Sequence, residues 1–152
     1  MAARKSLVWK GKAVTERMRA AQIAGVNGTM GACVVDAKSN HAWQNRTGVL
    51  EGGIDVVSYA RSDGVGVEGT WGVRDVRYAL IHELGGWVHA QAAKALAFQV
   101  PDGSWRFVKA VFIPARPYLR PAADRHYPEL AARIRKAFDR GGSPAGAGAA
   151  NG

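Results

Sequence analysis

The clearest local pattern in the chain is Leu96-Ala-Phe-Gln-Val-Pro-Asp-Gly-Ser-Trp-Arg-Phe-Val-Lys-Ala-Val-Phe-Ile113. Apolar residues alternate along Leu96–Val100 and again along Trp105–Ile113, as they do on one face of a β-strand. Pro101-Asp102-Gly103 separates the two runs and has turn chemistry, since proline presets φ and glycine accepts a positive φ. The segment therefore predicts a β-hairpin whose apolar side chains, Trp105 and Phe107 included, point toward a core.

A second hairpin is predicted on the N-terminal side of the first. Gly53–Ala60 is rich in β-branched and aromatic residues, Ser62-Asp63-Gly64 is a turn signal, and residues 65–71 supply the returning strand. Between the hairpins, Tyr78–Leu84 is a short apolar run closed by two glycines. At this length its pattern fits a helix and a strand equally well.

Two helices are predicted outside the hairpins. Apolar residues recur at three- and four-residue steps from Ala13 to about Lys38, although Gly25, Gly28 and Gly31 lie inside that run. These glycines indicate either a close approach by another segment or a kink. Near the C-terminus one apolar helical stripe is formed by Tyr127, Leu130, Ile134 and Phe138.

These elements predict an α+β protein with a long N-terminal helix, an antiparallel sheet of two hairpins and a C-terminal helix. Residues 1–12 are expected to form a basic arm and residues 13–140 a single domain. Residues 141–152 are rich in glycine and alanine and are expected to be disordered, because they have nothing to bury.

The charge of the protein is concentrated at its two ends. The 152 residues carry 21 Lys+Arg against 12 Asp+Glu, a formal net charge of +9. Residues 1–20 contribute +5 and residues 116–140 contribute +4, while residues 21–115 are neutral. Such ends suit an acidic partner, either nucleic acid or an acidic protein surface. No apolar run is long enough for a transmembrane helix, and no signal-peptide region opens the chain, so we expect a cytosolic protein.

The sequence predicts no enzymatic site, no cofactor and no metal centre. His82-Glu83 resembles the opening of a zincin helix, but glycine occupies position 86, where that motif needs its second histidine. The lone Cys33 falls on the apolar stripe of the first helix and is expected to behave as a small hydrophobic residue. The carboxylates are scattered and form no acid–base pair.

Three motifs together resemble a family of tailed-phage proteins. They are Asn45-Arg-Thr-Gly-Val-Leu50, Tyr78-Ala-Leu-Ile-His-Glu-Leu-Gly85 and Ile113-Pro-Ala-Arg-Pro-Tyr-Leu-Arg-Pro-Ala122. Their order is similar to that in the tail-completion, head–tail joining proteins of long-tailed phages, which include minor tail protein Z-like and Mu-like virion morphogenesis proteins. The third motif is the most specific of the three.

The resemblance implies a structural virion component at the neck or the head-proximal end of the tail, assembled in the cytoplasm of a bacterial host. It implies a homo-oligomeric ring, with a hexamer favoured. It also implies contacts with other neck and tail proteins, such as the tail terminator, the tail tube or the head-closure protein, and non-specific contact with DNA in the channel.

Subunit contacts are expected at the motif residues. The candidates are Arg46, Thr47, Gly48, Leu50, Tyr78, His82, Glu83, Arg116, Pro117, Tyr118, Leu119, Arg120 and Pro121. Because proline fixes φ and biases the preceding residue to extended geometry, residues 116–121 are expected to form a stiff segment. The two arginines would then meet carboxylates of a neighbour. Alternatively, Tyr118 and Leu119 fill the core while the arginines cap the sheet, and both interpretations can hold.

A small basic nucleic-acid-binding domain is the alternative function. It would require residues 1–20 and 116–140 to lie on one face of the protein. Phosphate contacts by those residues would make DNA binding strongly salt-dependent.

Overall fold

The computed structural model describes residues 6–43, 48–74 and 78–141. Its elements in chain order are α1 (Gly11–Ser39), α2 (Val49–Gly53), β1 (Ile54–Ser62), β2 (Val67–Val73), α3 (Ala79–Leu84), β3 (Gly86–His89), β4 (Leu96–Gln99), β5 (Trp105–Val108), β6 (Ala110–Ile113), α4 (Leu119–His126), the 3₁₀ turn η1 (Tyr127–Glu129) and α5 (Leu130–Asp139). The protein is α+β, as the sequence predicts. The predicted disordered tail lies outside the described residues, except for Gly141.

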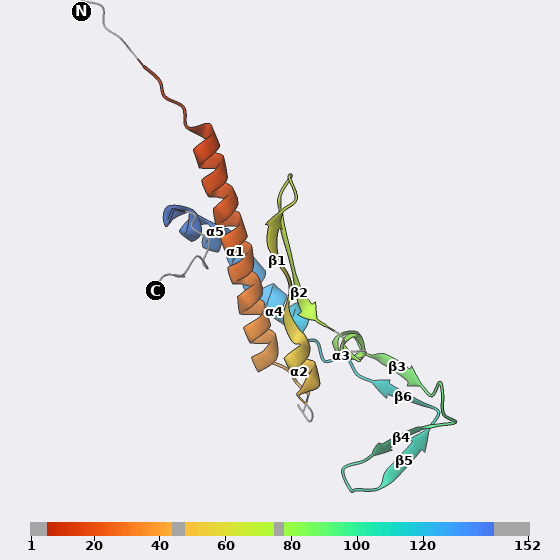
Figure 1. Ribbon diagram of the computed structural model, residues 1–152. Helices are drawn as coiled ribbons and strands as arrows, with labels where there is room; N and C mark the ends of the chain where they lie inside the picture. The colour runs from red at the N-terminus through yellow and green to blue at the C-terminus, as the bar shows by residue number, and fades with distance from the viewer. Residues whose placement is uncertain (1–5, 44–47, 75–77, 142–152) are drawn as a thin grey trace, which may run out of the picture.

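The long helix α1 is the element on which the body is built. The β1–β2 hairpin packs along it, and so do α4 and α5, while the first turns of α1 extend beyond the other elements (Figure 1). The predicted helix over Ala13–Lys38 is confirmed. It begins two residues earlier than expected, so Gly11 and Lys12 belong to the helix and not to the basic arm.

The core is formed where α1 meets the start of β1 and the start of α4. Cys33, Val34 and Ala37 of α1 pack with Ile54 and with the N-terminal part of α4. Cys33 is fully buried, and burial raises the pKa of its thiol. The expectation that it acts as a small hydrophobic residue is confirmed.

Gly25 allows α5 to approach α1 closely. A Cβ atom at this position would lie 2.5 Å from Cγ1 of Ile134 and 3.1 Å from the backbone nitrogen of the same residue. Gly31, six residues further along α1, has no neighbouring atom within 4 Å of a Cβ position. Of the two explanations that the sequence left open, Gly25 therefore supports close packing.

A buried carboxylate fastens α4 to the C-terminal half of α1. Asp36 accepts hydrogen bonds from Arg125, Nε at 2.6 Å and Nη2 at 2.7 Å, and its Oδ2 lies 3.0 Å from Nε2 of His126. Asn40 donates a further bond to the same carboxylate. The hydrogen bonds from Arg125 are the largest cause of a lowered Asp36 pKa, which falls to about 2.

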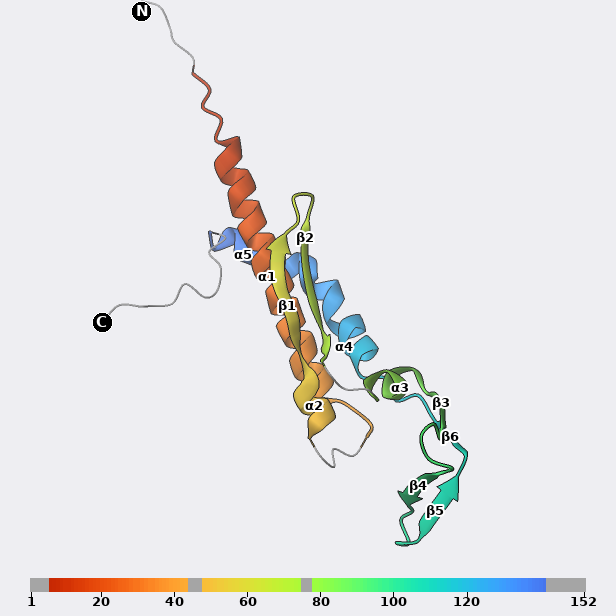
Figure 2. The same ribbon diagram turned by 45° about the vertical axis from the view of Figure 1, so that its right-hand side comes forward.

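The strands form three separate two-stranded antiparallel ladders, β1–β2, β3–β6 and β4–β5. The predicted hairpin over residues 53–71 is confirmed. The predicted hairpin over Leu96–Ile113 differs from the prediction, because its returning strand is interrupted at Lys109: β5 pairs with β4, whereas β6 pairs with β3. Together β3 to β6 make one long interrupted hairpin that projects from the body (Figures 1 and 2). We call this hairpin, Gly86–Ile113, the arm; it is distinct from the basic N-terminal arm expected at residues 1–12.

Arg120, the residue before Pro121, is helical, which corrects the extended geometry expected of it. Helix α4 begins at Leu119, so that Arg120 and Pro121 already lie in its first turn. Proline is tolerated there because the first amides of a helix have no partner within it. Tyr78–Leu84, left open by the sequence, is mostly the short helix α3. The helix α2 was not predicted, because five residues are too few to show a period.

We expect Gly25→Ala to destabilise the protein by about 1–3 kcal/mol, because the new methyl group would push α5 away from α1. Gly31→Ala is the matched control. It should be neutral or stabilise by up to about 1 kcal/mol, since alanine is the better helix former and the site is open. Urea unfolding measures both. Equal effects of the two substitutions would contradict the packing.

The Asp36 cluster predicts how stability falls in acid. A carboxyl whose pKa drops from 3.8 to about 2 on folding stabilises the protein above pH 3.8, and this contribution is lost as pH falls through about 2. The loss amounts to about 2 kcal/mol. Asp36→Asn should remove this loss of unfolding free energy in acid, as measured by urea unfolding at several pH values. Asp124→Asn, at an exposed neighbour of Arg125, should leave it in place.

Candidate interaction site at the junction of α3 and α4

The carboxylate of Glu83 joins two of the motifs that the sequence singled out. Its Oε2 accepts hydrogen bonds from the backbone N–H groups of Tyr118 at 2.8 Å and Leu119 at 3.0 Å. Its Oε1 accepts one from the N–H of Arg120 at 2.9 Å. A single side chain thus satisfies three amides at the start of α4 and places a negative charge at the positive end of that helix.

Backbone contacts hold the same two segments together one step further along. The N–H of Arg116 donates to the carbonyl of His82 at 2.8 Å. Gly85 has φ +71°, and a Cβ atom there would lie 2.6 Å from the backbone nitrogen of Ala115. Glycine is therefore required where α3 ends and the chain passes beside Ala115.

Tyr118 is a core residue. Its side chain is 0 % exposed, and its ring meets that of Trp43 edge to face with 4.5 Å between centroids. Burial raises the pKa of its hydroxyl to about 12, and the negative charge of Glu83 adds to the rise. Leu50 is also buried in this core. The alternative in which Tyr118 fills the core therefore applies, and both side chains lie inside the molecule.

His82 sits between aromatic rings on the inner side of α3. Its ring centroid lies 5.8 Å from that of Tyr78 and 6.1 Å from that of Trp43. Burial lowers the pKa of His82, and the positive charge of Arg116 lowers it further. His82 is consequently neutral at pH 7, and its place in the fold is that of a packed aromatic residue.

The outer surface of the junction is basic. Arg116, Pro117 and Arg120 are exposed, and within the described part of the chain neither guanidinium has a hydrogen-bond or ion-pair partner. Beside them opens a groove of about 280 Å³ lined by Val73, Ala79, Leu80, Glu83, Tyr118 and Leu119. An apolar groove next to two unpaired arginines is suited to an acidic, partly apolar protein surface.

The structure brings together most of the sequence-predicted contact residues. Tyr78, His82, Glu83 and residues 116–121 meet at this junction, with Leu50 beneath it. Gly48, with φ +70°, is the exposed residue before α2. Arg46 and Thr47 lie outside the described residues. His89 ends β3, on a different element from His82, and no group of three metal-ligating side chains lies close together in the described segments.

Sequence reasoning missed the exposed aromatic residues of the arm. Trp105 and Phe107, expected in the core, are both more than half exposed, because no helix or second sheet among the described elements covers the β4–β5 ladder. Trp87 and Phe112 are exposed in the same way on β3–β6, with ring centroids 5.5 Å apart. Alternation along a strand identifies one face of a ladder but does not show whether anything covers it.

Comparisons of the chain with protein-family models, curated proteins and solved structures found no match. The resemblance to tailed-phage proteins therefore rests on the three motifs alone. Among the described helices, none combines the length and apolar character that crossing a bilayer requires.

Glu83→Gln should destabilise the protein by about 1–3 kcal/mol, because it removes the charge and turns an amide donor toward backbone donors. The control is Glu68→Gln, which affects only an exposed pair with Arg61 at 3.4 Å and should cost less than about 1 kcal/mol. Urea unfolding compares the two variants. The assignment of Glu83 as the cap of α4 would be wrong if Glu83→Gln were as stable as Glu68→Gln.

Proposed function

We propose that this chain is a structural, non-enzymatic component of a tailed-phage virion, a tail-completion or head–tail joining protein that acts as a ring subunit. The observation that carries the proposal is the Glu83 junction. Two of the three motifs behind the resemblance, far apart in the chain, form one hydrogen-bonded unit there. One structural unit formed by both motifs would explain why their residues occur together.

The junction also supports a role in protein–protein contact. The carboxylate of Glu83 accepts hydrogen bonds from backbone amides and does not pair with Arg116 or Arg120. Arg120 stands on the first turn of α4, which Glu83 and Pro121 hold in place. Guanidinium groups held in a defined geometry pair well with carboxylates of a neighbouring protein. Further copies of the chain, the tail terminator, the tail tube and the head-closure protein are the proposed neighbours.

One observation favours nucleic-acid binding as the second candidate. The guanidinium of Arg17 donates to the carbonyl of Phe138 and lies 4.4 Å from the centroid of its ring. This contact places the basic first half of α1 beside the basic end of α5. The two charged segments are therefore partly brought together, as the alternative requires.

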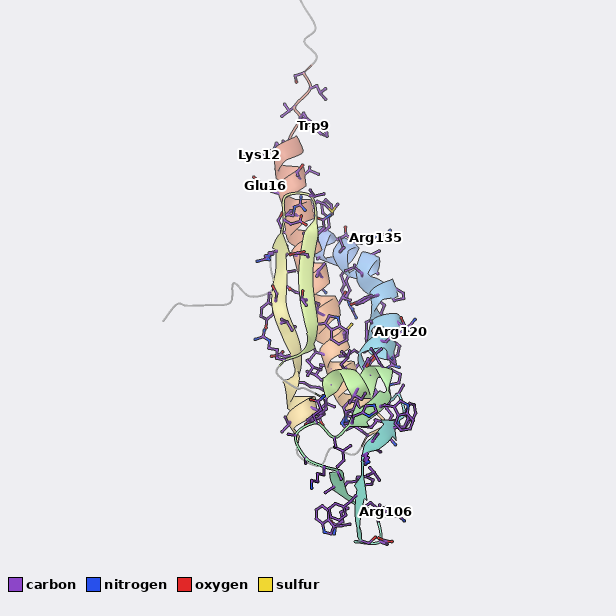
Figure 3. All side chains as sticks on the ribbon, turned by 90° about the vertical axis from the view of Figure 1, so that its right-hand side faces the viewer. Trp9, Lys12, Glu16, Arg106, Arg120 and Arg135 are labelled. Atoms are coloured by element: carbon purple, nitrogen blue, oxygen red, sulfur yellow. The ribbon has the colours of Figure 1, made fainter. Side chains whose placement is uncertain are left out.

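Two exposed arginines on the C-terminal helices distinguish the candidates. Arg120 belongs to the junction and Arg135 lies on α5 (Figure 3). Arg120→Glu should reduce assembly with neck partners at least tenfold, whereas Arg135→Glu should leave it within about twofold. Size-exclusion chromatography and electron microscopy of the purified protein with its partners measure assembly.

A DNA-binding protein would respond differently. Both charge reversals would then weaken binding to DNA to a similar degree, and that binding would fall steeply with rising salt. The phage-neck proposal would be contradicted by a protein that stays monomeric beside those partners, or that is missing from purified virions probed with an antibody against it.

A further inference from the structure

The arm leaves its aromatic side chains without a cover. Every residue of Gly86–Ile113 is described, and none of them is buried. Trp87, Trp105, Phe107 and Phe112 are each more than half exposed. A two-stranded ladder is marginally stable alone, so an arm that keeps this conformation needs a covering surface.

The exposed aromatic area is a substantial part of what a specific interface needs. Aromatic side chains bury roughly 150–250 Å² each, so four of them, each more than half exposed, present on the order of 300–600 Å². A standard protein–protein interface buries about 800 Å² on each partner. Val88 and Val111 pair with each other on the opposite face of the β3–β6 ladder, so the aromatic side chains supply the apolar area of this contact.

The opposite end of the molecule carries a second apolar surface without a cover. Leu7, Val8 and Trp9 are each more than three-quarters exposed, and Val14 and Met18 continue this surface onto α1. Trp9 lies at one end of the protein and Arg106, in the arm, at the other (Figure 3). Residues 6–10 have no regular secondary structure, and of their backbone groups the carbonyl of Lys10 already accepts a hydrogen bond, from the N–H of Val14 at 3.2 Å.

We infer that these two surfaces bind each other in neighbouring copies of the chain, with the arm of one copy covering residues 6–10 of the next. The inference rests on the proposed function and specifies its subunit contact. Surfaces that differ from each other and lie at opposite ends make a head-to-tail contact, which closes into a ring when the rotation between copies permits. The open edges of the arm also allow an extended segment to add as a strand.

The aromatic face of the β4–β5 ladder is uncharged, which favours an apolar contact with another copy over an ion-paired contact with an acidic partner. On the ladder face that holds Trp105 and Phe107, the opposite residues are Gln99 and Ala97, so the face has no charged group. Lys10 and Lys12 flank the N-terminal surface, and Arg106 and Lys109 belong to the arm. These like charges repel, so raising the salt concentration should strengthen the contact and not weaken it.

Disulfide trapping with two separately purified variants tests the contact. Ser6→Cys precedes Leu7, and Ala97→Cys lies opposite Phe107, so both leave the apolar residues in place. The native Cys33 is fully buried and contributes little background. The variants are mixed in a glutathione redox buffer and the products are identified by mass spectrometry. Ser62→Cys, at the exposed end of β1, replaces Ser6→Cys in the matched control.

The expected result is a disulfide between positions 6 and 97, formed at least tenfold more than between positions 62 and 97, and lost when Trp105→Ser and Phe107→Ser are added. A predominant disulfide between two copies of position 97 would overturn the inference in favour of an arm-to-arm contact. A yield equal to that of the control would overturn it as well. Presence of the protein in virions is scored separately and decides the proposed function alone.

Discussion

The arrangement of the molecule depends on one carboxylate. Glu83 accepts three hydrogen bonds from the backbone at the start of α4, and in doing so it fixes the point where the chain returns from the arm to the body. Tyr118 enters the core at this point, and α4 then leads to the Asp36–Arg125 contact with α1. Without the carboxylate, three N–H groups at a helix end would lack partners, beside a fully buried aromatic ring.

This junction separates two parts of the protein that differ in how they are stabilised. The body has a core around Cys33 and Ile54 and an ion pair between the buried Asp36 and the half-exposed Arg125, while none of the aromatic residues of the arm is buried. A stable body that carries an uncovered arm suits a subunit whose arm is covered by a neighbour when it assembles. The basic surface at Arg116 and Arg120 lies where the body and the arm meet.

Local patterns predicted the elements that depend on local physics. The period of α1, the turn at Ser62–Gly64 and the apolar stripe of α5 were all visible in the sequence, because each follows from side-chain spacing or from turn chemistry. The helical start of α4 was not predicted, because Pro121 indicates extended geometry for the residue before it. The cap that stabilises this helix start is Glu83, which is distant in sequence. The exposure of Trp105 and Phe107 was also hidden, because burial depends on which element covers a face. Thus the motif residues were found, but their roles required the fold.

Amide hydrogen exchange, followed by nuclear magnetic resonance, is the most direct test of the central claim that Glu83 anchors α4. The N–H groups of Tyr118, Leu119 and Arg120 are the first three of the helix end and would exchange freely if they faced only solvent. The structure predicts that all three are protected to the same degree as the amides in the middle of α1. Exchange of these three amides as fast as that of the exposed turn at Gly64 would contradict the account.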